Sequence, residues 1–166
     1  MSDTFWTLSG VDWALLGGGA AAILAGTGSA IGITHASGVI TGIVSEEPEK
    51  FGKLLPLAAI AGTQGIYGFI SAVLVLSFFN ILGGNAAIPG AEGFKIFLAC
   101  LPVGFVCLTS GIYQGLTAAS AAGIVARRGE DAGKALIFPA LVETYAVLSL
   151  IITILMLLSI QAVYGG

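Results

Sequence analysis

The sequence predicts an all-α membrane protein with four transmembrane helices, arranged as two tandem, duplicated helical hairpins. Two observations predict this fold class: the chain is strongly apolar, and its few charges are clustered. Of its 166 residues, 57% are hydrophobic and 9% are charged, whereas a typical soluble domain carries about 25% charged residues. The mean hydropathy of +1.01 is typical of membrane proteins. The net charge of −3 and the absence of a basic patch argue against nucleic-acid binding.

The charges divide the chain into four long stretches. All of them except Glu143 lie in the N-terminal segment or in three short polar breaks. The stretches exceed the roughly 20 residues of a spanning helix and lack the alternation of a barrel strand. We therefore expect a short N-terminal segment at 1–12, a first hairpin at 13–82 with helices at about 13–45 and 54–82, an outer loop at 83–95, and a second hairpin at 96–166 with helices at about 96–126 and 135–163.

The two hairpins are related by an internal repeat. The segment "GIVSEEPEKFGK" at 42–53 resembles "GIVARRGEDAGK" at 123–134, an offset of 81 residues, and nine residues are identical at this offset between Gly42 and Thr144. Such self-similarity indicates a duplication. The same register pairs Glu143 with Gly62, so only the second hairpin carries a carboxylate at this position.

Basic residues predict the orientation of the hairpins. Five of the six lie in the first and third breaks, and only Lys95 lies in the second. The positive-inside rule then places the loops at 46–53 and 127–134 in the cytoplasm and both termini on the outer side of a cell membrane. Three aromatic residues suit the outer interface: Trp6, Trp13 and Tyr164.

The first helix is rich in small residues, which let helix backbones approach closely. The small-xxx-small pairs are Gly28 with Gly32 and Gly38 with Gly42. The third helix has a similar stretch, whereas the second and fourth are bulkier. We expect an inner layer of helices one and three, an outer layer of helices two and four, and packing of these four glycines in an assembly of identical subunits. Packing inside a single chain is the alternative.

Glu143 is the one acidic residue inside an apolar stretch. It lies nine residues past Lys134, or about 13 Å along a helix, which is near the middle of a membrane core roughly 30 Å thick. An ionised acid there costs about 2.5–3.5 kcal/mol. We therefore expect it to be protonated, ion-paired or bound to a cation.

The second helix and, less closely, the third supply polar partners at a similar depth. Thr63 and Gln64 share a helical face with Tyr67, and Gln114 lies in the third helix. A carboxylate, two amides and two hydroxyls offer oxygen ligands, which hard cations prefer, and one carboxylate balances one monovalent charge. Hydrogen bonds that merely tie the helices together are the alternative for each amide. The one histidine, His35, lies in another helix and no nucleophile motif is present, so catalysis by this chain alone is not expected.

Four segments resemble the proteolipid of rotary V/A-type ATPases, the four-helix, c-type ring subunit K, over residues 11–163. They are "GSAIGITHASGVITGIVSEEPE", "GTQGIYGF", "SGIYQGLTAASAAGIVAR" and "FPALVETYAVLSLIITILML". The resemblance implies a homo-oligomeric ring in which Glu143 carries the ion. It also implies a stator membrane subunit with a basic residue, central-stalk subunits at the cytoplasmic loops, and lipids as neighbours, with no organic cofactor.

The sodium-binding members of this family imply a ligand set for Na+. At the matching positions stand Thr63, Gln64, the backbone carbonyl of Ile60, Gln114 and Glu143, with Tyr67 closing the site. All of the side chains are present, which favours Na+ over H+ as the coupling ion. Two other classes remain open: a small proton-coupled secondary transporter, and a structural membrane adaptor that would leave Glu143 unexplained.

Overall fold

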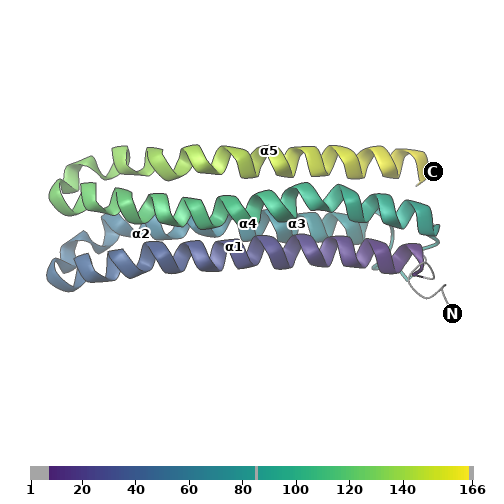
Figure 1. The fold of residues 1–166 in the computed structure, drawn as a ribbon, viewed down its shortest axis with the longest axis horizontal. Coiled ribbons are helices and arrows are strands. Elements are labelled where there is room, and N and C mark those ends of the chain that lie inside the picture. The colour runs from purple at the N-terminus through teal and green to yellow at the C-terminus, as the bar shows by residue number, and fades with distance from the viewer. Residues whose placement is uncertain (1–7, 85, 165–166) are drawn as a thin grey trace.

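The computed structural model describes residues 8–84 and 86–164, which form an elongated bundle of nearly parallel and antiparallel helices (Figure 1). The helices are α1 (Gly10–Glu46), α2 (Phe51–Ala59), α3 (Thr63–Phe78), α4 (Gly90–Arg127) and α5 (Ala132–Tyr164), with 3₁₀ turns at Pro48–Lys50, Ile60–Gly62 and Gly129–Asp131. α2, the second turn and α3 continue one another as a single span. The described residues therefore contain four helices long and apolar enough to cross a membrane, which confirms the predicted fold class.

All four spans begin earlier than charge alone suggested. α1 starts at Gly10 because Ser9 and Asp12 form a capping box, in which each side chain accepts a hydrogen bond from the other residue's backbone N–H. α4 starts at Gly90, and its first turns contain an ion pair of 3.0 Å between Glu92 and Lys95. Charges near a polar break are thus compatible with a helix that continues past them.

The four spans are arranged in two layers. α1 packs along much of its length against α4 and also against α3, while α5 packs mainly against α4 and also against α3. One layer is α1 with α4, and the other is α3 with α5. The start of α1, the end of α3, the start of α4 and the end of α5 lie at one end of the bundle, here called the terminal end, and the α1–α2 and α4–α5 turns lie at the loop end (Figure 1).

Glycines bring α1 and α4 into backbone contact. A Cβ atom on Gly115 would lie 2.0 Å from the carbonyl oxygen of Gly32, and one on Gly93 would lie 2.1 Å from that of Gly10. A Cβ on Gly28 would meet the carbonyl oxygen of Leu108 at 2.5 Å. The close approach requires residues without a side chain at these positions.

The four glycines expected to pack between subunits divide into two pairs. Gly28 and Gly32 are buried against α4 of the same chain, so their packing is within the subunit. Gly38 and Gly42 lie on an exposed part of α1 with no atom within 4 Å of an added Cβ. Only this second pair leaves open surface for a neighbouring subunit.

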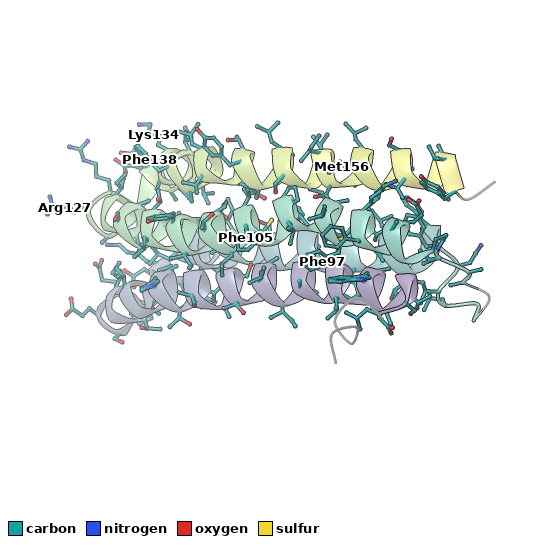
Figure 2. All side chains as sticks on the ribbon, turned by 45° about the vertical axis from the view of Figure 1, so that its right-hand side comes forward. Phe97, Phe105, Arg127, Lys134, Phe138 and Met156 are labelled. Carbon is teal, nitrogen blue, oxygen red and sulfur yellow. The ribbon has the colours of Figure 1, made fainter. Side chains whose placement is uncertain are left out.

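Charged side chains lie at both ends of the bundle, and a cluster of aromatic side chains lies at the terminal end. Arg127 and Lys134 project from the loop end, while Phe97 lies toward the terminal end (Figure 2). At the terminal end Trp13 packs edge-on against Phe94 with ring centroids 5.1 Å apart. Tyr164 accepts a hydrogen bond of 3.1 Å from Lys95. Trp6, expected at the same interface, lies outside the described residues.

Candidate ion-binding site

Glu143 lies on α5, half-buried beside α3 and α4. Its Oε1 accepts a hydrogen bond of 2.6 Å from the hydroxyl of Tyr67 on α3. Its Oε2 accepts one of 3.3 Å from the side-chain amide of Gln114 on α4. Three helices therefore converge on one carboxylate. Charge-assisted bonds of this kind are stronger than bonds between neutral groups.

A buried amide pair extends the site away from Glu143. Gln64 and Gln114 are both fully buried, and Gln64 Nε2 donates a hydrogen bond to Gln114 Oε1. Gln114 Nε2 also donates to the carbonyl oxygen of Pro139 at 3.1 Å. Ser110 completes the network: it lies 3.4 Å from Gln64 Nε2 and donates to the carbonyl oxygen of Val142 at 3.2 Å. Both amides are thereby held in fixed positions, as buried polar groups require.

A 3₁₀ turn at Ile60–Gly62 shapes the α3 side of the site. The hydroxyl of Thr63 donates to the carbonyl oxygen of Ile60 at 2.9 Å and lies 3.5 Å from Oε1 of Gln64. Just after the turn, the hydroxyl of Ser29 on α1 accepts a hydrogen bond of 2.8 Å from the N–H of Gly65. Short 3₁₀ stretches inside a helix often mark functional positions. Here the turn gathers a carbonyl, a hydroxyl and an amide oxygen.

The site is chemically suited to a single hard cation. Its oxygen atoms come from one carboxylate, two amides, a hydroxyl and a backbone carbonyl, which are ligands that hard cations prefer. Glu143 is the one ionisable carboxylate among these groups, so a monovalent cation would leave the site neutral. The described residues contain no cluster of three or more His, Cys, Asp or Glu side chains that would suit a transition metal.

The structure brings most of the sequence-predicted residues into one network. Glu143, Gln114, Gln64 and Tyr67 are joined directly by hydrogen bonds, and Thr63 joins them through Gln64. Ser110 was not predicted, although it lies four residues before Gln114 and therefore on the same helical face. Ser29 was not predicted either, because its role depends on a contact between α1 and α3 that no spacing reveals.

Gly62, the repeat-related counterpart of Glu143, lies in the 3₁₀ turn and makes no comparable contact. A Cβ at this position would meet the side chain of Ile33 at 3.4 Å, which is ordinary van der Waals contact. The first hairpin thus has room for a small side chain here, and the described chain has one intramembrane carboxylate site for four helices.

The sequence profile of the ATP synthase C subunit matches the chain twice, at residues 16–75 and 97–156. The chain belongs to the ATP synthase C-subunit family. The two matches begin 81 residues apart, which is the offset of the internal repeat and confirms the predicted duplication. Family membership also confirms that this proteolipid is a non-catalytic, ion-translocating subunit, and its four spans make it a multi-pass membrane protein.

Three relatives of this proteolipid carry related names. V-type sodium ATPase subunit K of Enterococcus hirae is 40% identical over 150 residues, which is 90% of this chain and 93% of the relative. A-type ATP synthase subunit K of Methanocaldococcus jannaschii is 42% identical over 149 residues, covering 90% of this chain and 64% of the relative. V-type proton ATPase subunit c' of Eremothecium gossypii is 36% identical over 97 residues, which is 58% of this chain and 57% of the relative. The resemblance to the V/A-type proteolipids is thereby confirmed.

Replacing Tyr67 by phenylalanine tests the contact that covers Oε1 of Glu143. The change removes one charge-assisted hydrogen bond, of about 1.5–3 kcal/mol, while keeping the ring. We expect a hydrophobic carbodiimide to modify Glu143 about tenfold faster or more, at 1.4 kcal/mol per factor of ten. Tyr145→Phe, two residues past Glu143 on an exposed face, is the matched control. Equal labelling rates in the two variants would show that Tyr67 does not shield the carboxylate.

Proposed function

We propose that this proteolipid is a rotor-ring subunit of a V/A-type rotary ATPase that carries Na+ on Glu143. The observation that carries the proposal is the half-buried carboxylate of Glu143, held by Tyr67 and Gln114 among further oxygen donors. Na+ would be bound by Glu143, Gln64, Thr63, Gln114 and the carbonyl of Ile60, with Tyr67 closing the site. Binding would require the side-chain amide of Gln114, whose Nε2 donates to Glu143 in this structure, to turn its oxygen toward the ion.

Two considerations favour Na+ over H+. Carrying a proton requires one carboxyl group, whereas this site surrounds its carboxylate with amide, hydroxyl and carbonyl oxygens suited to a hard cation. The relative that this chain matches over 93% of its length is named a sodium ATPase subunit. The same rotor role with H+ is the alternative, in keeping with the proton ATPase named among the relatives.

The proposed assembly is a closed ring of identical subunits that turns against a stator. The stator would supply a basic residue and two aqueous half-channels, one releasing the ion from Glu143 and the other reloading the site. The loops at 46–53 and 127–134 would face the cytoplasm and meet the central stalk, with both termini on the outer side of the cell membrane. Lipids would cover the outer layer formed by α3 and α5.

The energetics fit ion-driven rotation. Moving one elementary charge through the membrane field is worth about 2.3 kcal/mol per 100 mV, so several ions in sequence accumulate enough work to couple to ATP chemistry in partner subunits. Because Gly62 replaces the second acid, each four-helix chain carries one ion. Fewer ions per turn favour pumping against a steep gradient.

Na+ is expected to protect Glu143 from carbodiimide. The reagent attacks an unoccupied, protonated carboxyl group, and bound Na+ excludes both the proton and the reagent. Millimolar Na+ should therefore slow labelling of the purified ring at a pH where labelling is otherwise rapid, as measured by mass spectrometry of the peptide that contains Glu143. An equal concentration of K+, a larger cation, is the control and should protect less. Absence of protection by Na+ would assign the site to protons.

A further inference from the structure

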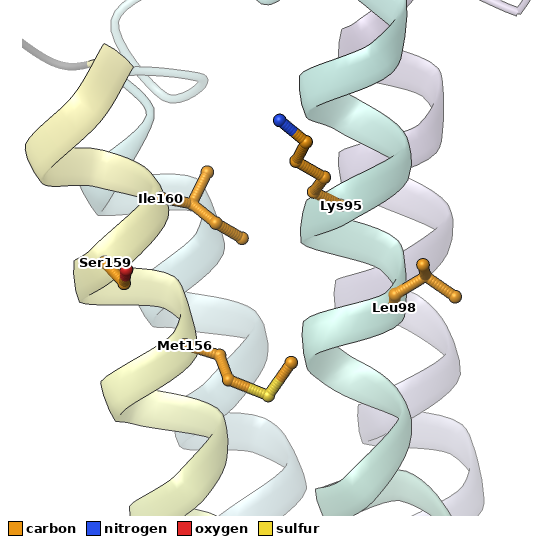
Figure 3. A pocket seen from close by; sticks show the side chains of 5 residues that line it. All are labelled: Lys95, Leu98, Met156, Ser159 and Ile160. Atoms are coloured by element: carbon orange, nitrogen blue, oxygen red, sulfur yellow. The ribbon is translucent and has the colours of Figure 1, made fainter.

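The α4–α5 side of the chain carries an open groove near the terminal end. It is lined by Lys95, Leu98, Met156, Ser159 and Ile160 and has a volume of about 300 Å³. Figure 3 shows α4 and α5 in front and the other helices behind, so the groove opens away from α1 and α3. In a ring of such chains this side faces a neighbouring subunit.

The opposite side of the chain presents a second hollow, on α1. Asp12 lies in it with exposed leucines, Leu15 and Leu16, and its volume is about 560 Å³. This hollow faces away from α4. Gly10 and Gly17 mark the side of α1 that contacts α4, and Asp12 and Gly19, each two residues further on, are rotated by about 200° from them.

The backbone contact between α1 and α4 places Asp12 and Lys95 at the same height. Gly10 touches Gly93, and each charged residue lies two residues, about 3 Å, further along its helix. The same rotation of about 200° that turns Asp12 away from α4 turns Lys95 away from α1. The acid and the base therefore stand at one level on opposite sides of the subunit.

A second pair of residues stands at one level on opposite sides of the subunit, further from the terminal end. Gly28 touches Gly111, and two residues further on stand Ala30 on α1 and Tyr113 on α4. Ala30 is small and exposed, whereas Tyr113 is bulky and 61% exposed. At this level the outward side of α1 is small where that of α4 is large, which suits two surfaces that interlock.

Both charges have capacity for a partner from another chain. Asp12 is exposed and accepts hydrogen bonds from Ser9, and no ion pair joins it to a cation among the residues that the structure describes. The Lys95 side chain is 51% exposed and contacts Glu92 and Tyr164. An ammonium group has three donors, which leaves one for a further acceptor.

We infer that Asp12 of one subunit pairs with Lys95 in the α4–α5 groove of the neighbouring subunit. This groove is then the docking site for α1 of a second copy of the chain. The inference rests on the proposed ring, because cyclic symmetry brings one side of each subunit against the opposite side of its neighbour without any shift in height. The exposed leucines of α1 then cover the apolar wall of the groove. The ion pair fixes the axial register of adjacent subunits, the role that charges serve best at an interface.

Charge reversal tests the pair. In the intact ring, Asp12→Lys or Lys95→Asp alone places like charges against each other around the whole ring, which we expect to lower the temperature at which the purified ring dissociates on a detergent gel. The double variant restores an opposite pair and should recover most of the loss. Ser9→Ala, which removes the capping hydroxyl but keeps the charge of Asp12, is the control for helix capping and should change the temperature little.

Cysteine cross-linking tests the same geometry without altering a charge. Leu15 and Leu98 are exposed beside Asp12 and Lys95, and both native cysteines, Cys100 and Cys107, are buried. Oxidation of a Leu15→Cys/Leu98→Cys variant should give a ladder of linked multimers, and neither single variant should. The inference would be overturned if the double charge variant did not recover the dissociation temperature and the cysteine variant gave no ladder. If native mass spectrometry still showed intact rings, the proposed function would stand. A wild-type chain that is monomeric would overturn both.

Discussion

Glu143→Gln is expected to abolish ATP-driven cation transport by the complex while leaving the ring assembled. Glutamine keeps the size of the side chain, and its oxygen still accepts a hydrogen bond from Tyr67. It removes the one negative charge available to neutralise a bound cation. Loss of one partner of a buried charge pair costs about 3–5 kcal/mol, which corresponds to binding weaker by more than ~100-fold. The measurement is uptake of ²²Na+ into vesicles that contain the reconstituted complex, with retention of the ring checked by native mass spectrometry.

The control for Glu143→Gln is Glu130→Gln. Glu130 lies in the 3₁₀ turn between α4 and α5 at the loop end, and it is the counterpart of Glu49 in the repeat, so its substitution also removes one negative charge from every subunit. Binding of ²²Na+ to the isolated ring, which lacks the central stalk that this loop would meet, should stay near the wild-type level in that variant and be lost in Glu143→Gln. Residual uptake by Glu143→Gln at the wild-type rate would assign the ion to another group and refute the proposed mechanism.

The sequence singled out Glu143 because a lone charge in an apolar stretch is conspicuous. Depth counted from Lys134 placed it near the membrane middle, and the same count on the second helix singled out Gln64. The 3₁₀ turn at Ile60–Gly62 was not predicted, since nothing in "IAGTQG" interrupts an apolar helical pattern. Nor could spacing reveal that Gln114 bonds to the carbonyl of Pro139, because that contact depends on the relative rotation of α4 and α5.

The small residues of α1 show a second limit of sequence reasoning. Periodicity identifies which residues share a face but not which helix covers that face. Gly28 and Gly32 satisfy the same small-xxx-small pattern as Gly38 and Gly42, yet the first pair is buried within the chain and the second is exposed. The difference follows from helical phase. α4 covers the stripe that continues from Gly32 through Ala36 and Ile40. Gly38 and Gly42 are rotated by about 200° from the last two of these residues.

Gly115→Ala is expected to destabilise the subunit strongly, because the added methyl group has no space between α1 and α4. Its Cβ would lie 2.0 Å from the carbonyl oxygen and 2.3 Å from the Cα of Gly32, and backbone atoms of a long packed helix do not move aside as a flexible side chain does. Overpacking typically costs about 1–3 kcal/mol. Here the cost should reach the upper part of that range, because separating the helices also weakens the contacts at Gly28 and Gly10. The free energy of unfolding, measured by titration of the purified chain from mild detergent into SDS, provides the readout.

Gly123→Ala, eight residues along the same helix, separates steric conflict from helix propensity. An added Cβ at Gly123 meets no atom within 4 Å, so that variant should gain up to about 1 kcal/mol from the better helix propensity of alanine. The same intrinsic gain applies at Gly115, so the difference between the two variants isolates the cost of the helix contact. If both substitutions stabilised the chain equally, α1 and α4 would have to lie further apart than the structure places them. The alignment of Asp12 with Lys95 would then lose its basis, because the glycine contacts that set their common height would be absent.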